Sequence, residues 1–166
     1  MMVADILSDA FLAAVAGTGF GAVSRPPRRA FPFIALLSGV GHALRFCLMT
    51  LLGVDLATAS FFAALFIGLG SLVFGGKIHC PMTVLYIPAL LPMIPGMYAY
   101  RSIFALVMLM QQFNDPVLAA QYLERMLMNA TVTVSVVFLL SLGATLPTFL
   151  FPRRAYSLTR KRPSGN

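Results

Sequence analysis

The chain has 166 residues, of which 59% are hydrophobic and only 10% are charged, and its formal net charge is +7. This composition excludes a water-soluble globular domain and is typical of an integral membrane protein, because several apolar runs reach the ~20 residues that cross a bilayer as a helix. In a soluble protein the positive charge would suggest nucleic acid, but here the basic residues fall in short loops and a C-terminal tail, where membrane topology explains them.

The first predicted helix covers roughly residues 6–23. Ala13, Gly17 and Gly21 recur in it at every fourth position, a spacing of small residues that lets two helix backbones approach closely. The N-terminus carries Asp5 and Asp9 and no Lys or Arg. Because a secretory signal peptide begins with positive charge, we expect a retained helix that packs against a neighbour.

The second predicted helix covers roughly residues 31–53. Ser38, His42 and Arg45 follow one another on the same helix face, so this polar stripe should contact protein or water rather than lipid. Arg45 either extends toward the interface or has a functional role. His42 is either a packing residue or a titratable group of the site.

The third predicted helix covers roughly residues 57–76, and the last covers roughly 122–146 after a short connection that begins at Asp115 and Pro116. Ser60, Ala64 and Gly68 repeat the close-packing spacing in the third helix. After it, His79 and Cys80 are adjacent, but two adjacent ligands do not make a metal site. The sequence therefore predicts no metal and no cofactor.

Between these helices lies an interrupted apolar stretch, residues 81–114. Pro88, Pro92, Pro95 and Gly96 fall inside it, and each proline removes a backbone N–H that a helix needs. We expect either a broken helix or a re-entrant piece followed by a span that restarts at Gly96, with the first N–H groups of the new helix unpaired. Irregular backbone at membrane depth is tolerated only where protein buries it or where it lines a wet cavity, so this stretch is the predicted solute pathway or its gate.

The charges predict a topology with about five transmembrane helices, the N-terminus outside and the C-terminus in the cytoplasm. With this orientation every acidic residue falls near the outer side, and nine of the 12 basic residues fall on the cytoplasmic side, as the positive-inside rule requires. The cytoplasmic nine are Arg25, Arg28, Arg29, Lys77, Arg153, Arg154, Arg160, Lys161 and Arg162. We therefore expect one helical transmembrane domain over residues 1–150 and a basic cytoplasmic tail over 151–166.

The same topology leaves no carboxylate within the membrane, so a proton or sodium relay built on an intramembrane Asp or Glu should not reside in this chain alone. Two histidines and no buried acid also provide no nucleophile with its base and orienting group, and we expect no enzyme activity. Arg101 is the most costly residue to insert, at about 2.5–3.5 kcal/mol at the centre of a helix. Its partner would be a substrate carboxylate, the freed carbonyls of Pro88 and Leu91, or an acid of another subunit.

Three stretches resemble the threonine/serine exporter (ThrE) family, in particular its C-terminal membrane half, which also occurs as a separate small subunit. They read GFGAVSRPPRRAFPFIALLSGVGHALR (residues 19–45), SFFAALFIGLGSLVF (60–74) and PALLPMIPGMYAYR (88–101). The third, with its Pro-x-x-Pro-Gly core and following Tyr, is the most specific. The resemblance implies export of small hydrophilic metabolites driven by the proton motive force, together with a larger membrane subunit that corresponds to the other half of the exporter.

The leading hypothesis is therefore a subunit of a two-component exporter of threonine, serine or related amino or carboxylic acids in the bacterial inner membrane. Its partners are the larger subunit, the solute and the lipid bilayer. A non-transporting membrane scaffold is the alternative, and a stand-alone channel is a third possibility. In the exporter, Arg101 and the amides of Gly96 to Tyr98 would meet a substrate carboxylate, and His42 would handle a proton. The predicted substrate-binding residues are His42, Arg45, Pro92, Pro95, Gly96, Tyr98, Tyr100 and Arg101.

Overall fold

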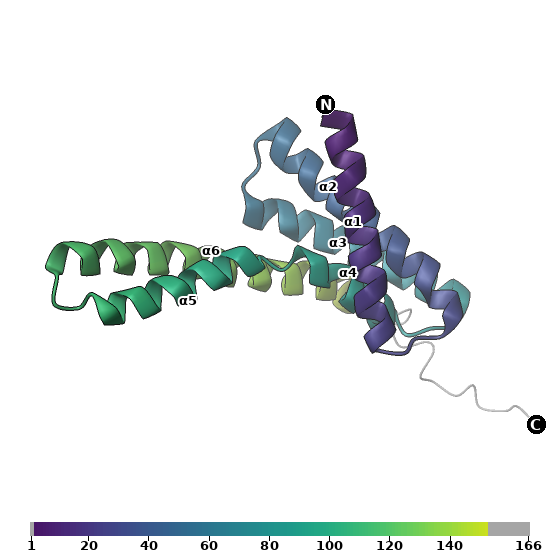
Figure 1. Ribbon diagram of the computed structural model, residues 1–166. Helices are drawn as coiled ribbons and strands as arrows, with labels where there is room; N and C mark the ends of the chain where they lie inside the picture. Colours follow the sequence, from purple (N-terminus) through teal and green to yellow (C-terminus); the bar gives the residue numbers. More distant parts are fainter. Residues whose placement is uncertain (1, 153–166) are drawn as a thin grey trace, which may run out of the picture. The chain divides into compact units, whose positions relative to one another are not determined.

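The computed structural model describes residues 2–152, and within that range the chain is helical, with short connections and no strand. The predicted basic tail lies outside the described residues apart from its first two positions. The order along the chain is α1 (Met2–Val23), the 3₁₀ turn η1 (Arg28–Ala30), α2 (Phe31–Leu52), α3 (Leu56–Ile78), α4 (Met82–Leu90), the 3₁₀ turn η2 (Leu91–Met93), α5 (Gly96–Gln111) and α6 (Pro116–Leu150) (Figure 1).

Four of these helices, α1, α2, α3 and α6, are long and apolar enough to cross a membrane. The segments Met82–Met93 and Gly96–Gln111 satisfy the same criteria only as a pair joined at a break, so they form a fifth candidate, either a broken span or a re-entrant loop. The all-helical membrane fold with about five spans is thereby confirmed. The restart of a helix at Gly96 is confirmed as well.

The position of the break differs from the prediction. Pro88 lies inside α4, which continues to Leu90. Regular helix ends there, and the chain passes through the 3₁₀ turn that contains Pro92 before it leaves helical structure at Ile94 and Pro95. Proline removes only one helical hydrogen bond, so the helix accommodates the first proline and ends where two more follow three residues apart.

The last helix is longer than predicted at both ends. Residues 116–121 are not a connection, because α6 begins at Pro116. The side chain of Asp115 accepts hydrogen bonds from the N–H groups of Val117 (2.9 Å) and Leu118 (3.1 Å). An acidic cap followed by proline in the first turn is a favourable helix start. At the other end α6 continues through Pro147 to Leu150, beyond the predicted end at 146.

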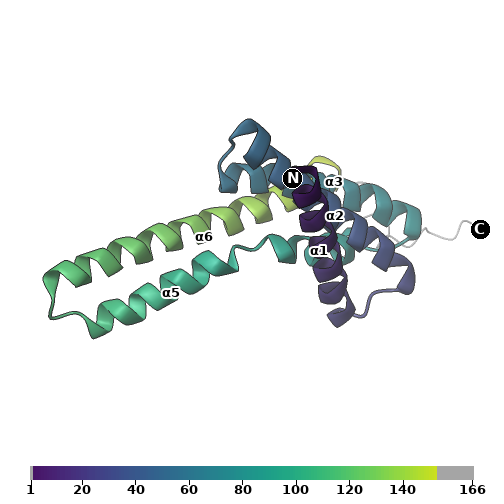
Figure 2. The same cartoon turned by 45° about the horizontal axis from the view of Figure 1, so that its top comes forward.

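The chain divides into two compact units. Unit 1 consists of the described parts of Met1–Met93 and Leu139–Asn166, and unit 2 is Ile94–Phe138. In unit 1, α1, α2, α3 and α4 pack on one another, with Leu37, Ile67 and Leu85 almost completely buried between them. In unit 2, α5 and the first part of α6 run alongside each other as a hairpin (Figures 1 and 2). The hydroxyl of Ser102 donates to the Met126 carbonyl across the hairpin at 3.1 Å, but Ala105 is the only residue of α5 that is buried.

Glycines place α1 directly against α2, as the small-residue spacing predicted. A Cβ atom at Gly17 would lie 2.6 Å from the Ser38 Oγ, and one at Gly39 would lie 3.0 Å from the Ala10 carbonyl oxygen. The buried hydroxyl of Ser38 donates to the carbonyl of Ala13 at 2.7 Å. The backbones of α1 and α2 therefore approach closely at this level, which positions the side chains one turn further along each helix.

The predicted stripe of small residues on α3 is confirmed in the same way. Ser60 and Ala64 are fully buried, and a Cβ at Gly68 would lie 2.7 Å from the carbonyl oxygen of Ala144 on the last part of α6. From that side, a Cβ at Gly143 would lie 2.5 Å from the Phe61 carbonyl oxygen. Close contact between α3 and the last part of α6 thus encloses unit 1 on the side of α3.

Candidate functional site

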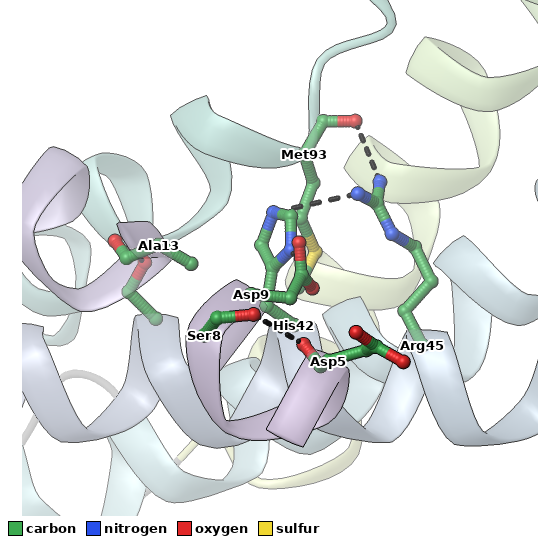
Figure 3. Close-up of polar contacts among 8 residues, drawn as sticks. Asp5, Ser8, Asp9, Ala13, His42, Arg45 and Met93 are labelled. Atoms are coloured by element: carbon green, nitrogen blue, oxygen red, sulfur yellow. Dashed lines mark hydrogen bonds and ion pairs between the residues drawn. The ribbon is translucent and has the colours of Figure 1, made fainter. Parts of the chain in front are cut away.

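The strongest polar cluster in unit 1 joins α1, α2 and the turn η2. The Nδ1 atom of His42 lies 2.9 Å from the Oδ2 atom of Asp9, and the Nε2 atom of the same ring lies 3.4 Å from the Nη2 atom of Arg45. The Nη1 atom of Arg45 donates to the carbonyl oxygen of Met93 at 2.9 Å. Figure 3 shows the imidazole of His42 between the Asp9 carboxylate and the Arg45 guanidinium, with the Met93 carbonyl facing the guanidinium. We call Asp9, His42 and Arg45 the triad.

The contact at Met93 satisfies the backbone at the interrupted span. In a continuous helix the Met93 carbonyl would accept the N–H of Met97, four residues on. The chain leaves helical structure at Ile94 and Pro95, so that donor is lost and the Arg45 guanidinium takes its place. A guanidinium is well suited to this position, because it presents several donors in a fixed plane and remains charged.

Close packing of α1 against α2 explains why the triad forms. Asp9, Ala13 and Gly17 are four residues apart on one face of α1, and Ser38 and His42 are four apart on the facing side of α2. The Ser38 hydrogen bond to the Ala13 carbonyl fixes the two helices one turn away from the triad. As a result Asp9 and His42 are brought to hydrogen-bond distance.

The burial of the triad is graded from one member to the next. The side chain of Asp9 is 38% exposed, whereas that of His42 is 9% exposed. The polar stripe of α2 therefore contacts protein, as predicted: Ser38 is fully buried and His42 almost so. The guanidinium of Arg45 contacts His42 and the Met93 carbonyl.

The sequence placed Asp9 near the outer side of the membrane and assigned it no partner. Asp9 belongs to the candidate span Val3–Val23 and pairs with a histidine on the next helix. The charge distribution assigned it to the outer side together with the other acidic residues. The signal that would have identified it is its register, since Asp9 lies on the same face as Ala13, Gly17 and Gly21, the face predicted to pack against a neighbour.

The eight predicted site residues divide between the two units. His42, Arg45 and Pro92 belong to unit 1, and only the first two take part in the triad. The residues in unit 2 are Pro95, Gly96, Tyr98, Tyr100 and Arg101. Within the hairpin the guanidinium of Arg101 is exposed and has no hydrogen-bond or ion-pair partner. Tyr100 is 61% exposed and stacks on Phe104, with ring centroids 6.3 Å apart.

The amides at the start of α5 are less available than predicted. The N–H of Gly96 donates to the Ile94 carbonyl at 2.8 Å, and the N–H of Tyr98 donates to the Pro95 carbonyl at 3.1 Å. Of the three amides considered, only that of Met97 has no acceptor in the described part of the chain. The reason is local, because the turn that restarts the helix satisfies its own first donors.

Two other features of the described residues do not provide a solute site. A hollow of about 410 Å³ lies between α2 and α3, and its lining is apolar; it includes Leu36, Val40, Phe66, Leu69, Val73 and Phe74. It offers no group to orient a hydrophilic solute. Nowhere in residues 2–152 do three or more His, Cys, Asp or Glu side chains come together as metal ligands.

Comparison with known proteins gives a family but no structural precedent. No solved structure matches the chain. The family model for the threonine/serine exporter, ThrE, matches residues 9–150, a range that contains the whole triad, the break at Ile94 and Pro95, and the hairpin. The match agrees with the apolar helices that are long enough to cross a membrane. The chain therefore belongs to the threonine/serine exporter (ThrE) family.

Proposed function

We propose that the chain is one subunit of a two-component exporter of small hydrophilic acids, with threonine and serine as the first candidates. It would work in the bacterial inner membrane with a larger subunit that corresponds to the other half of the exporter, and the proton motive force would drive it. Family membership supports transport rather than catalysis. The candidate spans support a location in a membrane.

The observation that carries this proposal is the Arg45 guanidinium bound to the Met93 carbonyl at the interrupted span. An intact helix pairs all of its backbone N–H and C=O groups internally, as lipid requires. A membrane helix with only a structural role would therefore not be interrupted. Breaks of this kind are typical of transporters, in which the ends of half-helices face small charged solutes. Here the carbonyl at the break accepts a hydrogen bond from a charged side chain.

The hairpin supplies the proposed contact for a carboxylate. Arg101 is exposed and has no partner within the hairpin, yet it lies in a helix whose neighbouring residues Ile103 and Phe104 are apolar and exposed. A cation in such surroundings needs an anionic or carbonyl partner in the membrane. The carboxylate of the solute, aided by the free N–H of Met97 and the hydroxyl of Tyr100, would provide it; an acid of the partner subunit is the competing choice.

The alternative is a non-transporting scaffold, and the apolar surface of the hairpin favours it. Met97, Ile103 and Met110 are 62%, 64% and 72% exposed, so unit 2 can bury apolar area against another subunit. The two functions differ in what the break does. In a scaffold, Pro95→Ala and Tyr100→Phe leave solute flux untouched, whereas in the exporter both reduce it.

The test is efflux of labelled threonine, serine and a dicarboxylate from cells that carry this chain and its membrane partner. Cells that carry either component alone are the controls. We expect efflux of at least one solute only when both components are present, and a lower efflux when a protonophore collapses the proton gradient. Equal efflux with and without this chain, for every solute in the panel, would contradict the exporter.

A further inference from the structure

The contacts of His42 determine which ring nitrogen carries its hydrogen. A guanidinium has donors and no acceptor, so the Nε2 atom of His42, 3.4 Å from the Arg45 Nη2 atom, must accept. The hydrogen of the neutral ring is then on Nδ1, which donates to the Asp9 carboxylate at 2.9 Å. In this state the triad holds one negative group, one neutral ring and one positive group, and its formal charges cancel.

A second proton on the ring has only Nε2 to occupy. In that position it would meet the guanidinium of Arg45, so two donors and two positive charges would face each other at the 3.4 Å contact. On the opposite side the Asp9 carboxylate stabilises the imidazolium. Protonation of His42 therefore keeps the contact with Asp9 and expels Arg45.

Few other charges of the described part of unit 1 act on the ring. From α1, Asp5 lies one turn from Asp9 and adds negative charge near the triad (Figure 3). The only ionisable side chain of α3 is Lys77, in its last turn, and that of α4 is Tyr86. Lys77 is ten residues, or about 15 Å along the helix, from Ile67, the residue that meets α2 at Gly41. The local balance at His42 is therefore set by Asp9 and Arg45.

Movement of Arg45 has a direct consequence at the interrupted span. The guanidinium contacts His42 through Nη2 and the Met93 carbonyl through Nη1, so both contacts belong to one rigid planar group, and withdrawal of that group from the ring also withdraws the donor of the carbonyl. Met93 itself remains packed on α2, because a Cβ at Gly41 would lie 3.1 Å from its Cε atom. The released carbonyl is then an unpaired acceptor at the break, available to water or to a polar solute.

The geometry points to the triad as a proton-binding site that controls this carbonyl. A proton from water reaches Nε2 of His42, Arg45 leaves both the ring and the Met93 carbonyl, and loss of the proton allows Arg45 to return. Proton binding by the triad is a property of this chain and does not depend on the proposed function. Only its consequence, the driving of solute export, rests on the proposed export function.

The first test reads the ring directly. The chain has two histidines, so the full chain with His79→Asn, labelled with ¹⁵N-histidine in lipid, gives one imidazole in magnetic resonance spectra. We expect its neutral form to carry the hydrogen on Nδ1, in Arg45→Leu as well because the Asp9 carboxylate still accepts it, and to shift toward the Nε2-protonated form only when Asp9→Ala is added. A neutral ring with its hydrogen on Nε2 while Arg45 is present would overturn the inference, whatever the chain transports.

The second test separates coupling from transport. In vesicles that contain this chain and its partner, His42→Gln should retain exchange of labelled for unlabelled threonine without a gradient, but should lose uphill transport driven by an imposed proton gradient. Glutamine is the matched substitute because its amide can donate to Asp9 and accept from Arg45, but cannot bind a proton at neutral pH. His79→Asn, outside the triad, is the control and should leave both activities unchanged.

The outcomes of the second test distinguish the two proposals. Uphill transport that persists at the wild-type rate in His42→Gln overturns the proton site and leaves the exporter intact. Loss of exchange together with uphill transport also overturns it, because His42 would then be needed for binding or folding. A wild-type chain that neither exchanges nor accumulates any solute of the panel contradicts the exporter, while the ring spectra still decide the proton site.

Discussion

Two arginines lie in apolar helices of this protein, and their surroundings differ completely. In unit 1, Arg45 is held by His42 and by the Met93 carbonyl. In the hairpin of unit 2, Arg101 is exposed and has no partner within that unit. An arginine whose donors are satisfied inside its own chain supports the fold, and one that is left unsatisfied is available for a solute or a subunit. Four variants test this comparison.

The largest effect is expected for Arg45→Ala, which should reduce both stability and flux. It removes the donor of the Met93 carbonyl and the cation of the triad. Losing hydrogen bonds to a charged group costs about 1.5–3 kcal/mol. Thermal unfolding is measured with a thiol-reactive dye in a Cys47→Ser background, because Cys80 is only 2% exposed in the folded chain whereas Cys47 is half-buried. Arg45→Lys, which keeps the charge, should fall between Ala and wild type; an unchanged unfolding midpoint in Arg45→Ala would show that the triad does not stabilise unit 1.

Arg101→Ala should abolish efflux while it leaves insertion and the unfolding midpoint unchanged. The reason is that Arg101 makes no interaction within the hairpin. The substitution therefore removes only the proposed contact with a substrate carboxylate. Labelled-threonine efflux and membrane fractionation measure the two properties. The control is Arg125→Ala, which removes another cation of unit 2, 5.9 Å from the Tyr122 ring centroid. Wild-type efflux in Arg101→Ala would remove Arg101 from the site.

Gly17→Val should lower both the unfolding midpoint and the efflux in part, because it separates the helices α1 and α2, which bring Asp9 to His42. The new Cβ would lie 2.6 Å from Ser38 Oγ, and overpacking of this kind costs about 1–3 kcal/mol. Gly19→Val is the matched control, since a Cβ at Gly19 meets nothing within 4 Å. Unfolding midpoints and efflux are compared for the pair. The packing argument is wrong if the two variants behave alike.

Asp115→Ala should have the smallest effect and should be confined to the hairpin. It removes the cap of α6, worth about 1 kcal/mol. We expect faster hydrogen exchange at the N–H groups of Val117 and Leu118, which donate hydrogen bonds to the Asp115 side chain in the wild type. We expect no change at the triad. Asp115→Asn retains an accepting oxygen and should restore protection. Equal exchange in all three proteins would mean that the cap does not hold the start of α6.

Sequence patterns predicted the helices of this protein well because the signals are local. Runs of apolar residues and their length indicate the spans, and Gly96 was identified correctly as the restart of a helix. The errors arose where one local signal was given too much weight. Pro88 was expected to break α4 but lies within it, and Pro116 was assigned to a connection although Asp115 and Pro116 together start α6.

At the polar site, too, local features were predicted from the sequence and contacts between helices were not. The sequence offered the carbonyls of Pro88 and Leu91, freed by proline, as one of three possible partners of Arg101, whereas the structure has Arg45 bound to the Met93 carbonyl. It did not predict that contact, because Arg101 is closer to the prolines in sequence and Arg45 is 48 residues from Met93. Contacts over such separations depend on helix packing, which the spacing of Gly17 and Ser38 allows but does not specify.

By itself, then, the sequence determined that the chain is a bundle of membrane helices with one interrupted span and with small residues where helices touch. Those properties follow from hydrophobicity and backbone chemistry, which act within one segment. Only the tertiary structure decided that Asp9 meets His42 and that Arg45 reaches the Met93 carbonyl. Each of these contacts joins side chains on different helices, and its formation depends on a register and an approach distance that no single segment contains.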